Sequence, residues 1–530
     1  MPQDLIHLRP LLWFLAAPLA GCPLILPAEH DLRVDADGDG YEVAGYSDGE
    51  DCDDTNAAVH PDVTEVCGDG QDNDCDGTAN TCGLSGTVDL SDANTKITPA
   101  ARSDKLGTAV ANVGDVDGDG TEDLLVGAPG VQYSFENTGA GYLMLGPAPG
   151  GKSLGVSNAD LLIYGANESE GVGETVAAGG DMNGDGYGDL LLGAPNRSKD
   201  DNEKIGAYYV VYGPGGPAMT TSAADATGLG GAAYDKLGSA LAAGNFTGNN
   251  QRDLAVGGPY ANKDGSDAGI VYLYTGPVEG GRNASKADYQ IYGGDSDYVG
   301  FALLSGDFTG DGLDDLWIGA PGSDDEAAEA GAAFLFAGPV EVNGLASAGY
   351  DGRLVGLLAS DAGGSSFASG DVNGDGYLDA IIGCPGADGV AADAGSALIL
   401  YGPISGERPA DAGAMGQTGG DLASTSVAAG DADGDGIDDL LVGAPARDVN
   451  ATDNGAAYLL YGPVDAKIAL GKANVKIGGE VDEDYLGAAV AMADWDKNGS
   501  SDMILGAYGQ DQDGAFNNGG LVYVFLIEGL

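Results

Sequence analysis

Histidine and basic residues are scarce in this chain of 530 residues. There are three histidines, none of them after His60, and 21 lysines and arginines stand against 83 acids, for a formal net charge of −62. Without histidine, the chain after residue 60 cannot use Ser-His or Cys-His nucleophilic chemistry or form an HExxH-type zinc site. The negative field repels nucleic acid and anionic lipid and attracts cations. We therefore expect no nucleic-acid partner and no catalysis of these kinds.

Long apolar runs are also missing, apart from one near the amino terminus. The run "LLWFLAAPLA" (11–20) is too short to span a bilayer as a helix, so residues 1–21 are expected to be an export signal. The stretch "LAGC" (19–22) resembles a bacterial lipobox, which implies cleavage before Cys22 and lipid on its sulfur. The alternative is a plain signal peptide with an incidental cysteine. Pro23, where an aspartate would resemble an inner-membrane retention signal, favours the outer membrane or cell surface, with membrane contact only through the lipid.

Cysteine is sparse too, with six residues in all. Four of them crowd into one acidic segment: Cys52, Cys67, Cys75 and Cys82. An exported segment of this kind is expected to form two disulfides, whose connectivity the sequence leaves open. Cys384 lies alone in the apolar stretch "AIIGCPG", so we expect a buried, unreactive thiol there.

Glycine, by contrast, is abundant, with 94 residues, and it punctuates a repeat. A nine-residue loop recurs at intervals of 60 to 66 residues, with first residues at 115, 181, 245, 307, 371, 431 and 494. An alternating stretch precedes each loop, an apolar run such as "DLLVGAP" follows it, and two further short runs complete the copy. Runs of this length, bounded by glycine and proline, are typical of strands. Four strands in each of seven copies predict an all-β fold, a seven-bladed β-propeller over residues 84–530.

The last copy is incomplete in a way that predicts how the ring closes. It ends at Leu530 after its third strand, and the segment "NTKITP" (94–99) before the first copy matches the missing fourth strand. We therefore expect an N-terminal strand to complete the last blade.

Over about residues 90–530 the repeat resembles FG-GAP repeats, the blades of the integrin alpha-subunit head. The Gly-Ala-Pro element is strong, whereas the Phe-Gly element is loose and is found in neither the fifth nor the sixth copy. It reads "LG" at 106–107, 237–238 and 486–487, and "VG" at 172–173 and 299–300. The resemblance implies a propeller that serves in adhesion or binding.

The loops alternate acids with glycines, as in "DVDGDGTED" (115–123). Calcium takes about six to eight oxygens at ~2.3–2.6 Å, and glycines at positions 4 and 6 let the side chains at positions 1, 3 and 5 converge. A backbone carbonyl at position 7 and an acid at position 9 would complete the shell. The expected calcium ligands are Asp115, Asp117, Asp119, Thr121 and Asp123; Asp181, Asn183, Asp185, Tyr187 and Asp189; Asp307, Thr309, Asp311, Leu313 and Asp315; Asp371, Asn373, Asp375, Tyr377 and Asp379; Asp431, Asp433, Asp435, Ile437 and Asp439; Asp494, Asp496, Asn498, Ser500 and Asp502.

The third loop, "NFTGNNQRD" (245–253), keeps only Asp253 as an acid, so we expect about six calcium ions in the propeller and none in this loop. Two alternatives remain open. The loops could be solvated acidic turns without metal, or calcium could brace the blades without any part in contacts or signalling.

A second acidic region, residues 35–82, follows a linker at 22–34 and resembles the MopE-type metal-binding motif. Its candidate ligands are Asp35, Asp37, Asp39, Asp72, Asp74 and Asp76. The family label implies copper, but copper prefers imidazole and sulfur, and these ligands are hard oxygens, so we expect one or two calcium ions. With little apolar material, the segment is expected to fold through metal and disulfides together. His60, before Pro61, is expected to be a turn residue.

These features predict an exported, calcium-binding, monomeric lipoprotein at the outer membrane or cell surface, or released from the cell. Its expected role is non-enzymatic: protein or glycan binding, adhesion or scaffolding on a ring of loops. The alternative is a secreted hydrolase or lyase that uses propeller carboxylates on polysaccharide or phosphodiester substrates.

Overall fold

The computed structural model divides the chain into two compact units, residues 1–81 and 82–530. The described residues of the first unit are 41, 52, 53, 55–57, 59, 60 and 75. Those of the second are 84–133, 135–147, 153–198, 203–449, 451–510 and 518–527.

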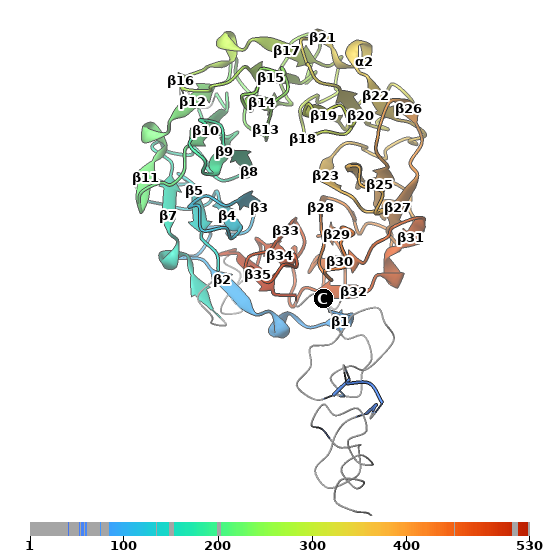
Figure 1. The fold of residues 1–530 in the computed structure, drawn as a ribbon. Coiled ribbons are helices and arrows are strands. Elements are labelled where there is room, and N and C mark those ends of the chain that lie inside the picture. Colours follow the sequence, from blue (N-terminus) through green and yellow to red (C-terminus); the bar gives the residue numbers. More distant parts are fainter. Residues whose placement is uncertain are drawn as a thin grey trace, which may run out of the picture. The chain divides into compact units, whose positions relative to one another are not determined.

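The second unit is a ring of seven five-stranded sheets, the blades, with the first strand of each blade facing the centre (Figure 1). From the centre outward, blades 1 to 4 contain β3 (Ala109–Gly114), β4 (Asp123–Ala128), β5 (Ala140–Met144), β7 (Leu161–Tyr164) and β11 (Ala218–Thr220); β8 (Thr175–Gly180), β9 (Asp189–Ala194), β10 (Ala207–Val211), β12 (Ala226–Leu229) and β16 (Gly280–Gly281); β13 (Ala240–Gly244), β14 (Asp253–Gly258), β15 (Ile270–Tyr274), β17 (Tyr289–Tyr292) and β21 (Asn343–Leu345); β18 (Leu303–Gly306), β19 (Asp315–Ala320), β20 (Ala332–Phe336), β22 (Gly352–Leu354) and β26 (Gly406–Arg408). Blades 5 to 7 contain β23 (Ser366–Gly370), β24 (Asp379–Cys384), β25 (Ser396–Leu400), β27 (Ala412–Met415) and β31 (Lys467–Ala469); β28 (Ser426–Gly430), β29 (Asp439–Ala444), β30 (Ala456–Leu460), β32 (Val475–Gly478) and β1 (Gly86–Val88); β33 (Ala489–Ala493), β34 (Asp502–Ala507), β35 (Leu521–Phe525), β2 (Thr95–Thr98) and β6 (Leu154–Gly155). The predicted all-β, seven-bladed propeller is confirmed.

The second and third strands of the blades are apolar on both faces because each blade is packed between two others. Every residue of β4 and of β5 is buried, and the other second strands share this pattern. This is why these strands appear in the sequence as short continuous apolar runs without the alternation of a sheet that has one wet face.

The N-terminal segment closes the ring at two places. Strand β2 pairs antiparallel with β35, with Ile97 opposite Val522, and so supplies the outer strand that blade 7 lacks. This confirms the predicted closure by residues 94–99. Strand β1 pairs in parallel with β32 of blade 6. The two strands therefore join the beginning of the propeller to its last two blades.

A fifth strand at the rim of each blade was not expected from the sequence. In each blade it pairs in parallel with the fourth strand and comes from the connection that leads to the fourth strand of the next blade, as β11 does with β7. A short helix follows most of these strands: η1 (Leu90–Asp92), η2 (Val156–Asn158), η3 (Thr221–Ala223), η4 (Ala284–Lys286), α2 (Ala346–Gly349) and η5 (Leu470–Lys472). The fifth strands have two or three residues, too few to show a hydrophobic period.

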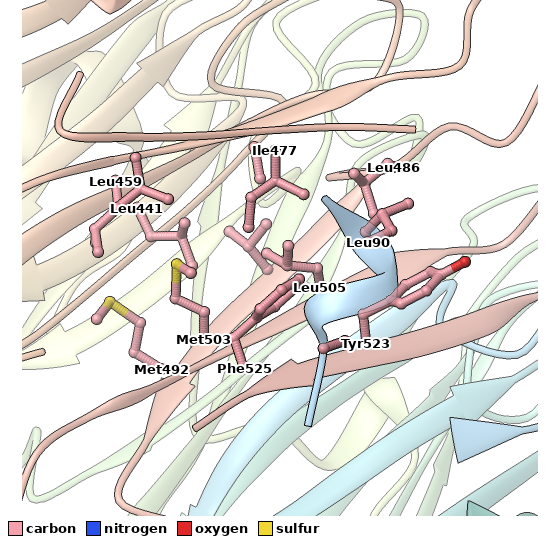
Figure 2. Close-up of a cluster of buried hydrophobic side chains, with 14 of the residues drawn as sticks. Leu90, Leu441, Leu459, Ile477, Leu486, Met492, Met503, Leu505, Tyr523 and Phe525 are labelled. Atoms are coloured by element: carbon pink, nitrogen blue, oxygen red, sulfur yellow. The ribbon is translucent and has the colours of Figure 1, made fainter. Parts of the chain in front are cut away.

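The core lies between neighbouring blades. One cluster joins Leu441, Leu459 and Ile477 of blade 6 to Leu505 and other side chains of blade 7. Leu90, from the closing segment, lies among them and is buried (Figure 2). The helix η1, which lies between β1 and β2 in the sequence, thus adds to this core.

Glycines of the two repeat elements meet where blades pack. A Cβ added at Gly127, in the Gly-Ala-Pro element of blade 1, would lie 2.0 Å from the carbonyl oxygen of Gly173, which precedes blade 2 and has a φ of +84°. At the closing joint, a Cβ at Gly506 would lie 2.3 Å from the oxygen of Gly107. The fifth copy, in which the sequence shows no Phe-Gly element, still places Gly364 here, against Gly319. Close backbone approach therefore explains the glycine of the Gly-Ala-Pro element, whereas the second position is Ser424, with a φ of +69°, in the sixth copy.

In the first unit, Cys52 and Cys75 form a disulfide with a Cα–Cα distance of 5.5 Å. This confirms disulfide bonding in the acidic segment and settles one pair. The His60 ring stacks on Tyr41, with ring centroids 4.6 Å apart. The remaining predicted residues here lie outside the described residues: Cys22, Asp35, Asp37, Asp39, Cys67, Asp72, Asp74, Asp76 and Cys82. In the second unit Cys384 is a buried free thiol, as expected.

Among the described residues, no helix has both the length and the apolar character needed to cross a membrane.

Candidate metal loops

The seven acidic loops connect the first and second strands of the blades, as residues 115–122 connect β3 to β4. Because successive strands of a blade are antiparallel, all seven loops lie on the same face of the ring, which we call the loop face. Loops between second and third strands and between successive blades lie on the opposite face.

The acid at position 1 is held by backbone amides of its own loop. Asp115 accepts hydrogen bonds from the N–H groups of Gly118 (2.6 Å), Asp119 (3.1 Å) and Gly120 (2.8 Å). Its counterparts accept equivalent bonds in the other predicted loops: Asp181, Asp307, Asp371, Asp431 and Asp494. The amides can turn inward because Gly118 and Gly120 have φ of +82° and +80°. Each loop thus wraps around its first carboxylate.

Side chains at positions 3 and 5 make shorter-range bonds. Asp117 accepts from the N–H of Asp119 at 3.1 Å, and Asp119 accepts from the N–H of Thr121 at 2.7 Å. Position 3 makes the same bond in loops with Asn183, Asn373, Asp433 and Asp496. Position 5 does so through Asp185, Asp311, Asp375, Asp435 and Asn498, to the N–H of Tyr187, Leu313, Tyr377, Ile437 and Ser500. At position 3 of the fourth loop, Thr309 donates its N–H to Asp315.

The acid at position 9 is fully buried and ties three parts of the blade together. One Asp123 oxygen accepts from the N–H of Val116 at 2.7 Å, and the other accepts from the N–H of Gly146 at 2.9 Å, beyond the third strand. The same clamp recurs at Asp189, Asp315, Asp379, Asp439 and Asp502. The glycine donor of the first six blades belongs to the Gly-Pro element that closes the third run, so the clamp explains both features of the repeat.

Burial raises the pKa of these clamp carboxyls, and the neighbouring loop acids raise it further, while the amide hydrogen bonds act in the opposite direction. The pKa of Asp123 rises to about 6, that of Asp379 to about 7 and that of Asp439 to about 8. A bound cation would lower the pKa of these carboxyls again, because it balances their negative charge. The sites therefore hold negative charge that the protein alone stabilises poorly.

Within the described part of the chain, two loops bring three carboxylates together. In each group, one oxygen per residue lies within 4.8 Å of the others: Asp115, Asp117 and Asp123 in the first loop, and Asp431, Asp433 and Asp439 in the sixth. Ligands across a calcium ion are up to ~5 Å apart, since each is ~2.3–2.6 Å from it, so these donor sets fit calcium. Position 5 belongs to neither group. The seventh loop, with acids at the same three positions, forms no such group among the described residues.

The third loop keeps the turn without the acids. Asn245 accepts from the N–H of Asn250 at 3.2 Å, and Asn249 accepts from that of Gln251 at 2.7 Å. Asp253 makes the clamp bond to Gly276 N–H at 2.8 Å. The Arg252 guanidinium donates to the carbonyl of Gly179 in blade 2. Neutral amides thus suffice for the loop shape. The acids at positions 1, 3 and 5 of the other loops are therefore not needed to form the turn.

Neighbouring loops are tied to one another at position 8, which the sequence did not indicate. The Glu122 carboxylate accepts from the N–H of Asp494 at 2.7 Å, which links blade 1 to blade 7. Asp438 does the same with the N–H of Asp371 at 2.8 Å, and Asp314 with that of Asn245 at 2.7 Å. The position-1 residue of one loop is therefore positioned partly by the next blade.

A second set of acids was missed from the sequence and lies on the opposite face, before the first strand of each blade: Asp104, Glu170, Asp235, Asp297, Asp361, Asp421 and Asp484. Asp104 accepts from the N–H of Ala101 at 2.7 Å, and Asp235 from that of Ala232 at 2.7 Å. These bonds close the turns between blades, so the set is structural. The signal was present in the sequence, because each acid stands two residues before the Phe-Gly position, or before its equivalent where that element is lost.

Comparison with known proteins agrees with this repeat. A family model described as "FG-GAP repeat" matches six stretches, which are blades 1 to 6: 106–144, 172–211, 237–274, 299–336, 363–400 and 423–460. A second model, described as "Putative metal-binding motif" and of the MopE type, matches residues 51–80.

Several curated proteins are similar over part of the chain. Phosphatidylinositol-glycan-specific phospholipase D of Bos taurus is 31% identical over 219 residues, 38% of this chain and 24% of that protein. The Homo sapiens phospholipase of the same name is 31% identical over 236 residues, 41% of this chain and 26% of that protein. Integrin alpha-5 of Xenopus laevis is 30% identical over 229 residues, 41% of this chain and 20% of that protein. The matches thus span about a quarter or less of these relatives. The chain is an FG-GAP repeat β-propeller protein with a MopE-type metal-binding motif ahead of the propeller.

Proposed function

We propose that the protein is a calcium-loaded, non-enzymatic binding module of the cell envelope, which attaches to a protein or glycan partner as a monomer. The observation that carries this proposal is the pair of loops in which three carboxylates converge on a rigid ring. Convergence of like charges costs free energy unless a cation balances them.

Calcium is favoured by the chemistry of the donors. The position-1, -3 and -9 ligands are hard oxygens from carboxylates, amides and one hydroxyl, with no imidazole or thiolate among them, which suits calcium and disfavours copper and zinc. We propose six such sites, one in every loop except the third. The first and sixth loops support this best, because they hold the two convergent acid groups.

For the N-terminal region we propose one or two further calcium ions, at Asp35, Asp37, Asp39, Asp72, Asp74 and Asp76, and lipid attachment at Cys22. The match of residues 51–80 to the metal-binding motif supports a metal in this region. The lipobox-like sequence before Cys22 supports an outer-membrane or surface location.

A binding role is favoured over catalysis by the inventory of side chains. Residues 61–530 contain no histidine, and the one cysteine of the described propeller is a buried free thiol. The acids of both faces are engaged in loops and turns. The phospholipases D named above are enzymes, but the matched segment covers about a quarter of them. Integrin relatives support adhesion in the same limited way.

The experiment is a pull-down from bacterial envelope extract with the immobilised mature chain, in EGTA and in ~2 mM calcium, which exceeds the Kd of ~10⁻⁴–10⁻³ M typical of extracellular calcium modules. Specific capture in calcium that is lost in EGTA is the expected result. Turnover of a polysaccharide or phosphodiester panel would instead favour the hydrolase or lyase alternative. Equal capture in both buffers would contradict a calcium-dependent partner site.

A further inference from the structure

The seventh loop departs from the repeat at position 4. The other six loops have glycine there, whereas this loop has Lys497. Its φ of +64° lies in the left-handed region, where a lysine costs free energy that a glycine does not. The turn itself is ordinary, because Asn498 and Gly499 donate their N–H groups to Asp494 at 2.9 and 3.0 Å. The lysine therefore has to be explained by what its side chain contacts outside this loop.

Position 4 of one loop faces position 7 of the next loop around the ring. A Cβ added at Gly118 would lie 2.9 Å from the ring of Tyr187. The same contact recurs at Gly248 and Leu313, Gly310 and Tyr377, and Gly374 and Ile437. The first loop follows the seventh around the ring, and its position 7 is the smaller Thr121. The Lys497 side chain extends to this loop, where its Nζ donates to the carbonyl oxygen of Asp119 at 2.7 Å.

The ammonium group of Lys497 therefore lies beside a proposed calcium ligand of another blade. Hydrogen bonds from Thr121 lower the pKa of Asp119, and the charge of Lys497 lowers it further. Nζ is also close to Gly120, where an added Cβ would lie 3.0 Å from it. A cation bound in the first loop would be repelled by this ammonium group, since like charges repel.

The joint between blades 5 and 6 provides a matched comparison within the molecule. There Asp438, at position 8, accepts from the N–H of Asp371. Glu122 accepts in the same way from the N–H of Asp494 at the joint between blades 7 and 1. The fifth and seventh loops have three acids each, and the sixth and first loops have five each. The two joints thus have equal numbers of carboxylates, and they differ in charge by Lys497, the one base in these four loops.

We propose that Lys497 sets the calcium affinity of the first loop and makes it a weaker site than the sixth loop, which has acids at the same positions. This rests on the proposed function and adds its regulation. Calcium affinity follows the number of ligand charges, and an ammonium group offsets part of that number. Extracellular calcium modules bind with Kd of ~10⁻⁴–10⁻³ M, so the weaker site fills and empties as calcium changes while the sixth loop stays filled.

The test is a calorimetric titration of the metal-stripped, mature full-length chain with calcium chloride at low ionic strength. We expect Lys497→Gln to lower the Kd of one site about three- to tenfold, because it removes a repelling charge that solvent partly screens. Lys497→Arg keeps the charge, so its Kd values should match those of the unmodified chain. The gain from Lys497→Gln should shrink in ~1 M salt, where the screening length is ~3 Å.

Two ligand variants identify the loop on which the lysine acts. Asp115→Asn and Asp431→Asn each remove a carboxylate and keep an acceptor for the turn, as Asn245 does in the third loop. The gain from Lys497→Gln should vanish with Asp115→Asn and persist with Asp431→Asn. Persistence with both would place the effect in another loop and overturn the proposal.

The matched charge control is Lys472→Gln, at an exposed position on the outer edge of the ring. An equal gain in this variant would show a general charge effect and overturn the proposal. If calcium binds and Lys497→Gln leaves every Kd unchanged or raises one, this inference fails and the proposed function stands. A chain that binds no calcium would overturn both.

Discussion

Each acid in a loop has a separate task, and the third loop shows which task is which. Asp253 makes the clamp bond in a loop that has no other acid, so the position-9 carboxylate is needed for the blade itself. Asn249 makes the same turn bond as Asp435, at 2.7 and 2.8 Å, so position 5 does not need a charge to shape the turn. The charge at position 5 therefore has to be explained by something outside the turn, and a cation is our proposal.

One pair of variants can separate the contribution of the metal to stability from that of the turn hydrogen bond. Asn249→Ala removes a turn bond worth about 1 kcal/mol, and Asp435→Ala removes the same bond together with a proposed calcium ligand. For metal-free proteins we expect Asp435→Ala to lose no more unfolding free energy than Asn249→Ala, because it also removes charge repulsion with Asp433. In ~2 mM calcium we expect Asp435→Ala to lose more unfolding free energy than Asn249→Ala. An occupied site adds ~2.7 kcal/mol to the unfolding free energy when calcium is at a hundredfold excess over its Kd, and the variant forfeits part of that gain. Denaturant unfolding measures both, and equal losses in calcium would show that position 5 holds no ion.

At the level of elements, the blades are held by pairings between chain segments far apart in sequence. Strand β2 completes blade 7, and Leu90 of η1 fills the core between blades 6 and 7. The copies of the repeat predicted the missing strand, because an incomplete blade would leave an open edge and an apolar face. They did not predict β1 or the other fifth strands, which are short and carry no pattern of their own.

Truncation tests the closing strand. A chain that begins at residue 84 keeps β1, Leu90 and β2, and we expect its melting temperature to match that of the full chain. A chain that begins at residue 100 loses Ile97, a fully buried side chain whose removal alone costs about 2–5 kcal/mol, together with the strand that pairs with β35. We expect this chain to melt far lower or to aggregate. Thermal unfolding followed by circular dichroism compares the two, and identical melting curves would contradict closure by β2.

At the scale of the molecule, the main constraint is charge. A net charge of −62 opposes compaction, and the buried clamp carboxyls add to the cost. The loops place acids on one face of the ring. Acids lie on the opposite face as well, in the turns that precede the first strand of each blade.

Calcium removal should lower the stability of the whole propeller. Each occupied site adds about 2.7 kcal/mol at a hundredfold excess over Kd, so several sites together should raise the melting temperature strongly. We expect a marked fall of the melting temperature in excess EGTA, measured by calorimetry, with recovery when calcium is restored. Magnesium serves as the control, since its smaller octahedral shell suits these loops less well. An unchanged melt in EGTA would remove the structural role of calcium.

The clamp carboxyls also predict a pH dependence that calcium should reverse. Burial raises the pKa of Asp439 from 3.8 to about 8 and that of Asp502 to about 7. Between pH 4 and 8 the folded, metal-free protein therefore binds more protons than the unfolded chain, and its unfolding free energy should fall as the pH rises.

Calcium needs the deprotonated carboxylates, so the stabilisation that it adds should grow over the same range. Urea unfolding of metal-stripped and calcium-loaded protein at pH 5.5 and pH 8 measures both slopes. Parallel slopes would show that the clamp acids do not titrate with the metal.

The sequence by itself determined the number of blades, the strand that closes the ring and the place of the acidic loops. Local patterns of about nine residues, such as Asp115 to Asp123, recur in each copy and indicate these features. Such patterns can be recognised without knowing which residues are in contact. The tertiary structure decided which acids converge, which of them serve as clamps, and which blades the position-8 carboxylates tie together. Those outcomes depend on how neighbouring blades pack, and packing brings together residues that no local pattern relates.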